Sequence, residues 1–176
     1  MLRARLAASD DLEALRALMD LAIAENLKPY LTAEQIDASR AIMGLDTSLI
    51  EDGTYWVVED DGALAGCGGW SRRATLYGGD HSAGRDAALL DPARDSARVR
   101  AMYTHPAHVR RGVGGLILEL CEAAALAEGF ARLELVATLS GEPLYRKHGY
   151  RETERFDDGG VPLVRMVKPL PGRVEE

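Results

Sequence analysis

Residues 97–129 constrain the fold most, because they place a strand, a turn and a glycine-rich helix start in immediate succession. Between Ala97 and Tyr103 small or apolar residues occupy alternate positions, and this period of two predicts a strand with unlike faces. After a turn at 104–106, apolar residues recur at helical spacing up to Gly129, a predicted C-terminal cap: Val113, Leu116, Ile117, Leu120, Cys121 and Ala124. The segment VRRGVGG therefore opens a helix.

This helix start, residues 109–115, is predicted to bind an anion. The first amides of a helix have no partner within it, and the peptide dipoles add positive charge there. Three glycines leave these amides uncovered and two arginines stand beside them. The segment matches neither a Walker loop nor a dinucleotide-binding fingerprint. The fingerprint requires a small residue at the position that Ile117 occupies. The alternative is that the glycines only allow close packing and the arginines form a solvated rim.

The composition predicts one soluble domain. The 176 residues fit a single domain, which we place at 1–170, followed by a frayed tail at 171–176. No apolar run predicts a membrane span or a signal peptide, so we expect a cytoplasmic protein. The net charge of -7 argues against nucleic-acid binding. Cys67 and Cys121 lack metal-ligand spacing and a disulfide framework, so we expect core thiols and no metal site.

The other segments predict alternating strands and helices. A long loop at 72–95 has no sustained period, and loops of that length are often functional. The glycines of the strand at 63–71 indicate bulging or the close approach of another segment. The predicted elements are a strand at 2–7, helices after Ser9 or Asp10 and from Thr32 to about Gly44, strands at 54–59 and 63–71, the unit above, a strand at 131–138, a short helix at 140–149, and strands at 150–155 and 161–167.

The segment MYTHPAHVRRGVGGLILELCEAAALAEG resembles the diphosphate-binding motif of the GNAT superfamily of acyl-CoA N-acyltransferases. The first motif position is usually Gln or Arg in that family and is Val109 here. The order of predicted elements is also similar to that of the family. The resemblance implies an α/β fold with a central mixed, largely antiparallel sheet of about six or seven strands and helices on both faces. It also implies acetyl-CoA as the cofactor.

The resemblance implies two groups of cofactor-binding residues. In the family, N–H groups on the central strand near a bulge grip the thioester and the pantetheine arm, which here implies the amides of Met102, Tyr103 and Thr104. The pyrophosphate would lie on the helix start, formed by Val109, Arg110, Arg111, Gly112, Val113, Gly114 and Gly115. Arg146 and Lys147 either meet the outer phosphate of coenzyme A or form a solvated helix face.

The segment PLYRKHGYRE at 143–152 is similar to the GNAT segment in which a tyrosine on a short helix precedes a Gly-aromatic pair. The resemblance implies that Tyr145 protonates the departing thiolate of coenzyme A. A sulfur anion leaves more easily when a proton donor stands within hydrogen-bond reach. The alternative is an interior tyrosine that donates to a backbone carbonyl.

The general base is not identified by the sequence. Family members often use Glu or Asp on the central strand, where this chain has Arg98, Arg100 and Met102. Four residues elsewhere could accept the proton of the amine, each with a structural or exposed role as the alternative: Glu134, His105, Asp80 and His81.

The resemblance implies an N-acetyltransferase in which a primary amine attacks the thioester directly. The acceptor would be a small molecule or a peptide, in a pocket framed by the long loop, the hairpin glycines and the second helix. Trp70, Tyr77 and Tyr30 either line this pocket or belong to the core. The resemblance leaves a homodimer open. The alternatives are a noncatalytic acyl-CoA sensor that kept the phosphate site but lost the base, and a protein that uses the fold as a scaffold.

Overall fold

The structure, a computed structural model, describes residues 1–172. Of the predicted frayed tail, 173–176 lie outside the described residues. Seven strands form one mixed sheet in the order β1-β2-β3-β4-β5-β7-β6. They are β1 (Leu2–Leu6), β2 (Tyr55–Asp60), β3 (Ala63–Ser71), β4 (Ala97–Thr104), β5 (Arg132–Thr138), β6 (Arg151–Asp158) and β7 (Val161–Pro169).

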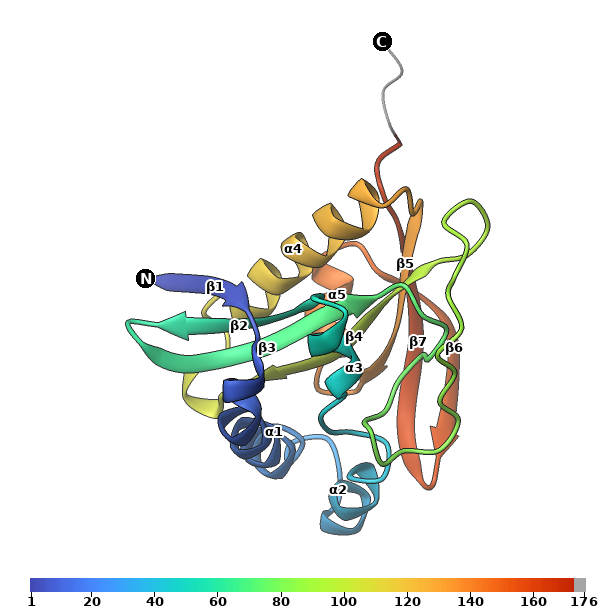
Figure 1. Cartoon of the computed structure of the whole chain (residues 1–176). Helices are drawn as coiled ribbons and strands as arrows, with labels where there is room; N and C mark the ends of the chain where they lie inside the picture. Colours follow the sequence, from blue (N-terminus) through green and yellow to red (C-terminus); the bar gives the residue numbers. More distant parts are fainter. Residues whose placement is uncertain (173–176) are drawn as a thin grey trace.

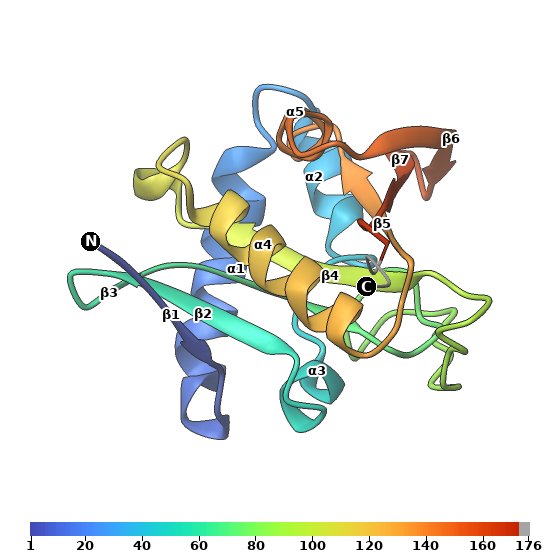
Figure 2. The ribbon, with the colours of Figure 1, turned by 90° about the horizontal axis from the view of Figure 1, so that it is seen from above.

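Helices cover both faces of this sheet. The long helix α4 (Val113–Ala127) crosses the upper face, and α1 (Leu12–Asn26) and α2 (Ala33–Ser39) lie below the sheet (Figures 1 and 2). Two short helices complete the set, α3 (Thr47–Glu51) and α5 (Glu142–Lys147). The predicted mixed sheet with helices on both faces is confirmed. Within residues 1–172, no helix combines the length and the apolar character that crossing a membrane requires.

Two helix boundaries differ from the prediction. The capping box at Thr32 is confirmed, because its hydroxyl accepts the Gln35 N–H and the Gln35 side chain accepts the Thr32 N–H. However, α2 ends at Ser39 instead of near Gly44, and the chain continues in turns. Neither Ser9 nor Asp10 caps α1. Residues 9–11 form a 3-10 turn in which Asp11 accepts the Ala8 N–H.

The pairing of β4 with β5 positions the site. These strands are parallel, as the strand–helix–strand unit predicts, but they pair only at Ala97–Leu133 and Arg98–Glu134. The other neighbouring strands in the sheet are antiparallel. Beyond these two pairs β4 and β5 separate, which leaves one edge of β4 without a partner strand. The sheet therefore opens at the carboxyl ends of its two central strands.

A bulge in β4 lies at this opening. Cys67 pairs with Tyr103 and Gly69 with Arg100, so β4 contains one residue more than β3 between these pairs. The extra residue bends the strand at Ala101, whose φ of 50° is unusual for a residue with a side chain. The Tyr55 hydroxyl donates to the Ala101 carbonyl at 2.5 Å. A buried side chain from β2 thus holds the bulge in place.

The glycines of β3 allow α4 to lie close to the sheet. A Cβ at Gly66 would come within 2.5 Å of a Val113 methyl, and one at Gly68 within 2.3 Å of the Met102 sulfur. The predicted close approach of another segment is confirmed here. Because α4 rests directly on β3 and β4, its N-terminus is held beside the opening in the sheet.

Candidate active site

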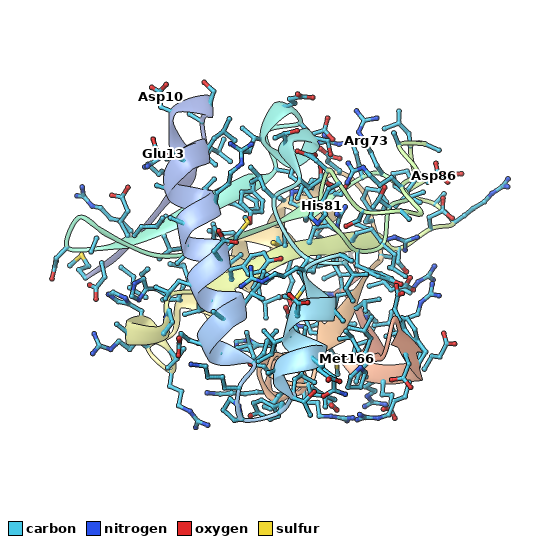
Figure 3. The ribbon with its side chains drawn as sticks, turned by 90° about the horizontal axis from the view of Figure 1, so that it is seen from below. Asp10, Glu13, Arg73, His81, Asp86 and Met166 are labelled. Atoms are coloured by element: carbon cyan, nitrogen blue, oxygen red, sulfur yellow. The ribbon has the colours of Figure 1, made fainter. Side chains whose placement is uncertain are left out.

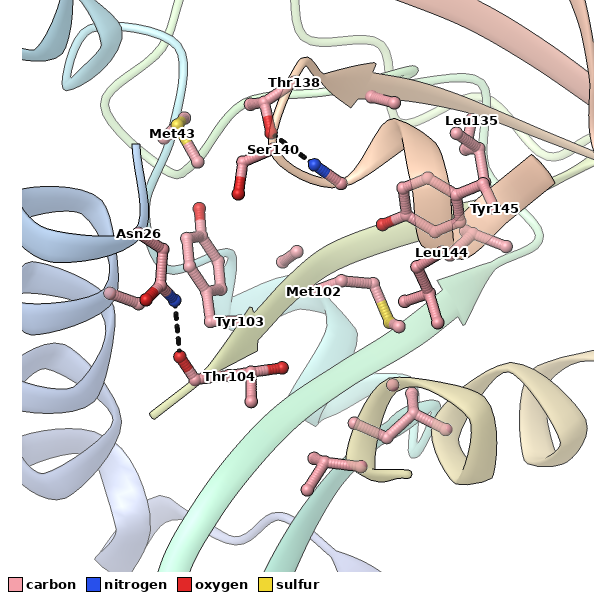
Figure 4. A pocket seen from close by; sticks show the side chains of 18 of the residues that line it. Asn26, Met43, Met102, Tyr103, Thr104, Leu135, Thr138, Ser140, Leu144 and Tyr145 are labelled. Carbon is pink, nitrogen blue, oxygen red and sulfur yellow. Dashed lines mark hydrogen bonds between the residues drawn. The ribbon is translucent and has the colours of Figure 1, made fainter. Parts of the chain in front are cut away.

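One large cavity occupies the opening between β4 and β5. Its volume is about 980 Å³, and β4, β5, the start of α4, α5 and the C-terminal part of α1 contribute to its walls (Figure 4). Arg111 is the one predicted site residue that does not line the cavity. The others all line it: Met102, Tyr103, Thr104, Val109, Arg110, Gly112, Val113, Gly114, Gly115 and Tyr145. Tertiary structure therefore brings the two predicted motifs, more than 25 residues apart, to one space.

The start of α4 offers free backbone donors to this cavity. Gly112 is the residue before the helix, with a φ of 88°, and its carbonyl accepts the Leu116 N–H. In the part of the chain that the structure describes, the amides of 113–115 donate no hydrogen bond. A Cβ at Gly112 would meet no atom within 4 Å. An anion can approach these amides from the cavity.

Gly114 and Gly115 have a packing role in addition. A Cβ at Gly114 would come within 2.5 Å of a Leu144 methyl, and one at Gly115 would be 3.1 Å from the ring of His148. Both neighbours belong to α5 and its C-terminal end. The alternative interpretation of the glycines, close packing, thus holds for these two positions, whereas Gly112 faces open space.

The two arginines of the motif differ in position. Arg110, at a φ of 61°, lines the cavity. The side chain of Arg111 is 60% exposed and lies outside the cavity, with Nη1 4.0 Å from a carboxylate oxygen of Asp60. On α5, Lys147 lines the cavity, while Arg146 pairs with Glu142 at 2.7 Å. Each motif thus has one cation in the cavity lining, Arg110 at the start of α4 and Lys147 on α5.

The backbone of β4 presents alternate residues to the cavity. The His105 N–H donates to the Ala65 carbonyl of β3, whereas the Thr104 carbonyl accepts from Asn26 of α1, each at 2.8 Å (Figure 4). Successive residues of a strand direct their backbone groups to opposite edges. The amides of Met102 and Thr104 thus face the edge that β5 leaves open. The Tyr103 amide faces β3, so the strand offers two of the three predicted donors.

Tyr145 projects its hydroxyl toward the middle of the cavity (Figure 4). The residue is 8% exposed, and no hydrogen bond joins its hydroxyl to any other described residue. The hydroxyl is also not among the fully buried polar atoms without a partner, so it reaches open space. The alternative of a tyrosine bonded to a backbone carbonyl does not apply. Burial raises the pKa of Tyr145 well above its usual value, which keeps the phenol protonated.

None of the four candidate bases lines the cavity. Glu134 pairs with Arg98 and Arg165, Asp80 accepts the Thr47 N–H, and His81 lies 2.6 Å from the Arg40 carbonyl. His105 is occupied by the Ala107 N–H. Among the described residues, the carboxylates that do line the cavity are those of two exposed residues, Glu25 and Glu119.

The aromatic candidates for the acceptor pocket separate into two groups. Tyr30 and Tyr77 line the cavity, and Tyr77 also donates to Asp158 at 2.7 Å. Trp70 does not line it. The residue is 2% exposed and its ring packs edge-on against Phe130 in the core beneath α4, so for Trp70 the core alternative holds.

A buried ion network that the sequence did not predict borders the cavity. Asp46 is 1% exposed and accepts from Arg100 at 2.9 Å, from Arg85 at 3.0 Å and from Ser48. Arg100 also donates to the Gly78 carbonyl at 2.6 Å. The network ties β4 to α3 and to the long loop, which lies on the same face as α1 and α2 (Figure 3). Asp46 and Arg100 are 54 residues apart, and no local pattern connects them.

Removing the Asp46 carboxylate should strongly destabilise the protein. We expect Asp46→Ala to lower the free energy of unfolding by about 3–5 kcal/mol, because it leaves the buried charge of Arg100 without its partner. Urea unfolding followed by circular dichroism measures this. Asp37→Ala, which removes an exposed carboxylate of α2 that makes no side-chain hydrogen bond or ion pair with the described residues, is the control and should cost less than about 1 kcal/mol. Equal midpoints for the two variants would contradict the structural role of Asp46.

Comparison with known families agrees with this geometry. A family model described as an acetyltransferase (GNAT) domain matches residues 51–152. A relative in Bacillus subtilis (strain 168), the uncharacterized N-acetyltransferase YjcF, is 40% identical over 63 residues. That alignment covers 35% of this chain and 45% of the relative.

Solved structures share the fold at low sequence identity. A GCN5-related N-acetyltransferase from Rhodopseudomonas palustris has a TM-score of 0.69 at 20% identity, over 97% of this chain and 95% of that one. PaiA N-acetyltransferase from Thermoplasma acidophilum, in complex with coenzyme A, has a TM-score of 0.67 at 14% identity over 96% and 99%. YncA of Salmonella typhimurium, with acetyl-CoA, has a TM-score of 0.64 at 16% identity over 99% and 96%.

Proposed function

Because the chain belongs to the GNAT acetyltransferase family, we propose that it transfers an acetyl group from acetyl-CoA to a primary amine. One observation carries the proposal: a single cavity joins the free amides of α4, the open edge of β4 and the unbonded hydroxyl of Tyr145. These are an anion site, a backbone that can pair with an extended ligand, and a proton donor. The proposal treats residues 1–170 as one N-acetyltransferase domain.

The proposed position of acetyl-CoA follows from these groups. The pyrophosphate binds the amides of 113–115, with Arg110 beside it, and the pantetheine arm extends along the open edge of β4 toward Tyr145. The amides of Met102 and Thr104 are the donors for this arm and for the thioester oxygen. Two of the structural relatives contain coenzyme A or acetyl-CoA, which supports the same cofactor here.

The proposed reaction is a direct transfer. The amine nitrogen forms a bond to the thioester carbon, the C–S bond breaks, and the sulfur leaves with its electron pair and takes a proton from Tyr145. The proton that the amine loses passes to water. An acyl-enzyme would need a thiolate, and burial raises the pKa of Cys67 to about 12, while Cys121 is fully buried in the core outside the cavity. Both thiols stay protonated.

A thiol-release assay with acetyl-CoA and a panel of primary amines tests the activity. We expect release of free coenzyme A that depends on the amine and forms one N-acetyl product per thiol, detected by mass spectrometry. Thiol release without an acetylated amine would contradict the transfer.

A noncatalytic acyl-CoA sensor is the second candidate, and the position of the four candidate bases outside the cavity favours it. Calorimetry with acetyl-CoA distinguishes the two functions when it is run beside the amine panel. Binding without turnover on any amine would favour the sensor, and the absence of binding would exclude both functions.

The pH dependence should reflect an acceptor that loses its proton without a protein base. We expect kcat/KM for the amine to rise about tenfold per pH unit up to the pKa of that amine, because only its neutral form attacks. Burial raises the pKa of Tyr145, so its acid form persists and no fall should occur up to pH 10. Initial rates between pH 6 and 10 measure this profile. A plateau that begins at the same low pH for amines of different pKa would reveal a base in the protein.

A further inference from the structure

Arg100 is a buried cation in the wall of the proposed active site. It is 3% exposed, stands directly before the β4 bulge and lines the cavity. One of its nitrogens, Nη2, makes both of its hydrogen bonds, to Asp46 and to the Gly78 carbonyl. In the described chain Nε and Nη1 have no acceptor, yet neither belongs to the fully buried atoms without a partner. These two donors therefore retain contact with open space, which beside Arg100 is the cavity.

Arg100 shares its carboxylate partner with a second arginine. Within residues 1–172, Asp46 is the one carboxylate that contacts Arg100, and it is shared with Arg85 at 3.0 Å. Two guanidinium groups thus surround a single carboxylate. Burial lowers the pKa of Arg100 against the opposing effect of Asp46, but a guanidinium stays charged at any working pH. Because Nε and Nη1 have no partner among the described residues, Arg100 offers charged donors to the cavity, where an anion is favoured.

The position of Arg100 indicates that this anion belongs to the acceptor and not to the cofactor. The phosphates of the cofactor would lie at the start of α4, on the upper face of the sheet. Arg100 extends to the opposite face, where it meets Asp46 and the long loop. The long loop, β5, β7 and the segment after α2 contribute apolar side chains to the cavity lining: Ile42, Met43, Leu76, Val136 and Leu163.

We propose that Arg100 binds a carboxylate of the acceptor, so that the substrates are amines that also carry a carboxylate and an apolar body, of which apolar α-amino acids are the simplest. The inference rests on the proposed acetyl transfer and names the substrate class of that site. The bound carboxylate accepts one charge-assisted hydrogen bond, from Nε or from Nη1, because these two N–H groups point to different sides of the guanidinium and Nη2 is occupied by Asp46 and Gly78. The amine then lies between Arg100 and the thioester.

Pairs of acceptors that differ in the carboxylate alone test the proposal. Leucine, methionine and phenylalanine are compared with their carboxamides, and kcat/KM is corrected for the neutral fraction of each amine. We expect the full chain to prefer each acid by at least about tenfold. Arg100→Gln should lower kcat/KM for the acids by about 10- to 100-fold and leave the amides within about threefold, since one charged hydrogen-bond partner is lost. Arg100→Lys, which keeps the charge, should retain part of the preference.

Arg98→Gln is the matched control. Arg98 lies two residues earlier on β4 and pairs with Glu134 at 3.0 Å, but it does not line the cavity. Its substitution should leave the ratio of acid to amide unchanged. Equal rates of acids and amides in the unaltered protein, or an equal loss for both in Arg100→Gln, would overturn the inference and leave acetyl transfer intact.

A binding measurement separates this inference from the proposed function. Calorimetry of the protein saturated with coenzyme A compares N-acetylleucine with N-acetylleucine amide, the products of one acceptor pair. Binding of the acid alone would support the role of Arg100 even if no amine in the panel were acetylated, a result that would count against the transfer alone. Equal affinity for the two products would overturn the carboxylate site.

Discussion

Gly112→Asp should lower the affinity for acetyl-CoA by at least about a hundredfold. The new carboxylate would lie at the start of α4, among the amides proposed to bind the pyrophosphate. Two unit charges 4 Å apart at an effective dielectric of 20 interact by about 4 kcal/mol, and each 1.4 kcal/mol is a factor of about ten in affinity. Solvent at the exposed loop weakens this repulsion, so we expect a loss of affinity of at least about a hundredfold and not the full factor that 4 kcal/mol would give.

Gly112→Asn is the matched control for this change. Asn and Asp have nearly the same shape and both tolerate the left-handed backbone that Gly112 adopts at a φ of 88°. A Cβ at this position meets no atom within 4 Å, unlike one at Gly114, which would disturb Leu144. The two variants thus differ in charge alone.

Calorimetry with acetyl-CoA and thermal unfolding should be measured on both variants. The Asp variant should unfold at the same or a higher temperature than the Asn variant, because a negative charge stabilises a helix N-terminus. A loss of binding in Gly112→Asp then cannot come from misfolding. Equal affinity of the two variants would show that the phosphates bind elsewhere.

Tyr145→Phe should lower kcat by about a hundredfold, because loss of a positioned proton donor typically costs 10²–10⁴ in rate. The affinity for acetyl-CoA should change by less than about threefold, since the hydroxyl makes no hydrogen bond to the described residues and the ring keeps its packing against Tyr150. Stability should be preserved for the same reason. Thiol-release kinetics give kcat, and calorimetry gives the affinity.

Tyr150→Phe is the control for this substitution. Tyr150 lies 5.9 Å from Tyr145 between ring centroids, but its hydroxyl donates to Glu122 and it does not line the cavity. Removal of the Tyr150 hydroxyl should change kcat by less than about twofold. If the two variants had equal turnover, the proton for the thiolate would come from solvent and Tyr145 would have no role as an acid.

The family and the free amides at the start of α4, the proposed phosphate site, could be predicted from the sequence because each depends on adjacent residues. The amides of 113–115 are free since they open a helix, and the helix is visible in a periodic run of apolar residues. The same reasoning applies to the short helix that carries Tyr145, where Pro143 and Gly149 mark its two ends. Local patterns of this kind persist in the fold because tertiary packing is compatible with them.

The groups around the acceptor could not be predicted in this way. Trp70 and Tyr77 are both aromatic residues flanking glycine-containing segments, yet one lies in the core and the other in the cavity. The four candidate bases were chosen by residue type, and packing placed each of them outside the cavity. Which residue faces a cavity depends on strand register and on the bulge at Ala101, and neither has a reliable local signal.

The sequence by itself determined the strand–turn–helix unit, its uncovered amides and the helix that carries Tyr145, because backbone geometry and periodicity over a few turns specify them. Tertiary structure alone decided that β4 and β5 separate after two residue pairs and that Asp46 meets Arg100 from 54 residues away. The first set depends on neighbours along the chain. The second depends on contacts between distant segments, which form only when the whole sheet and both of its helical layers are in place.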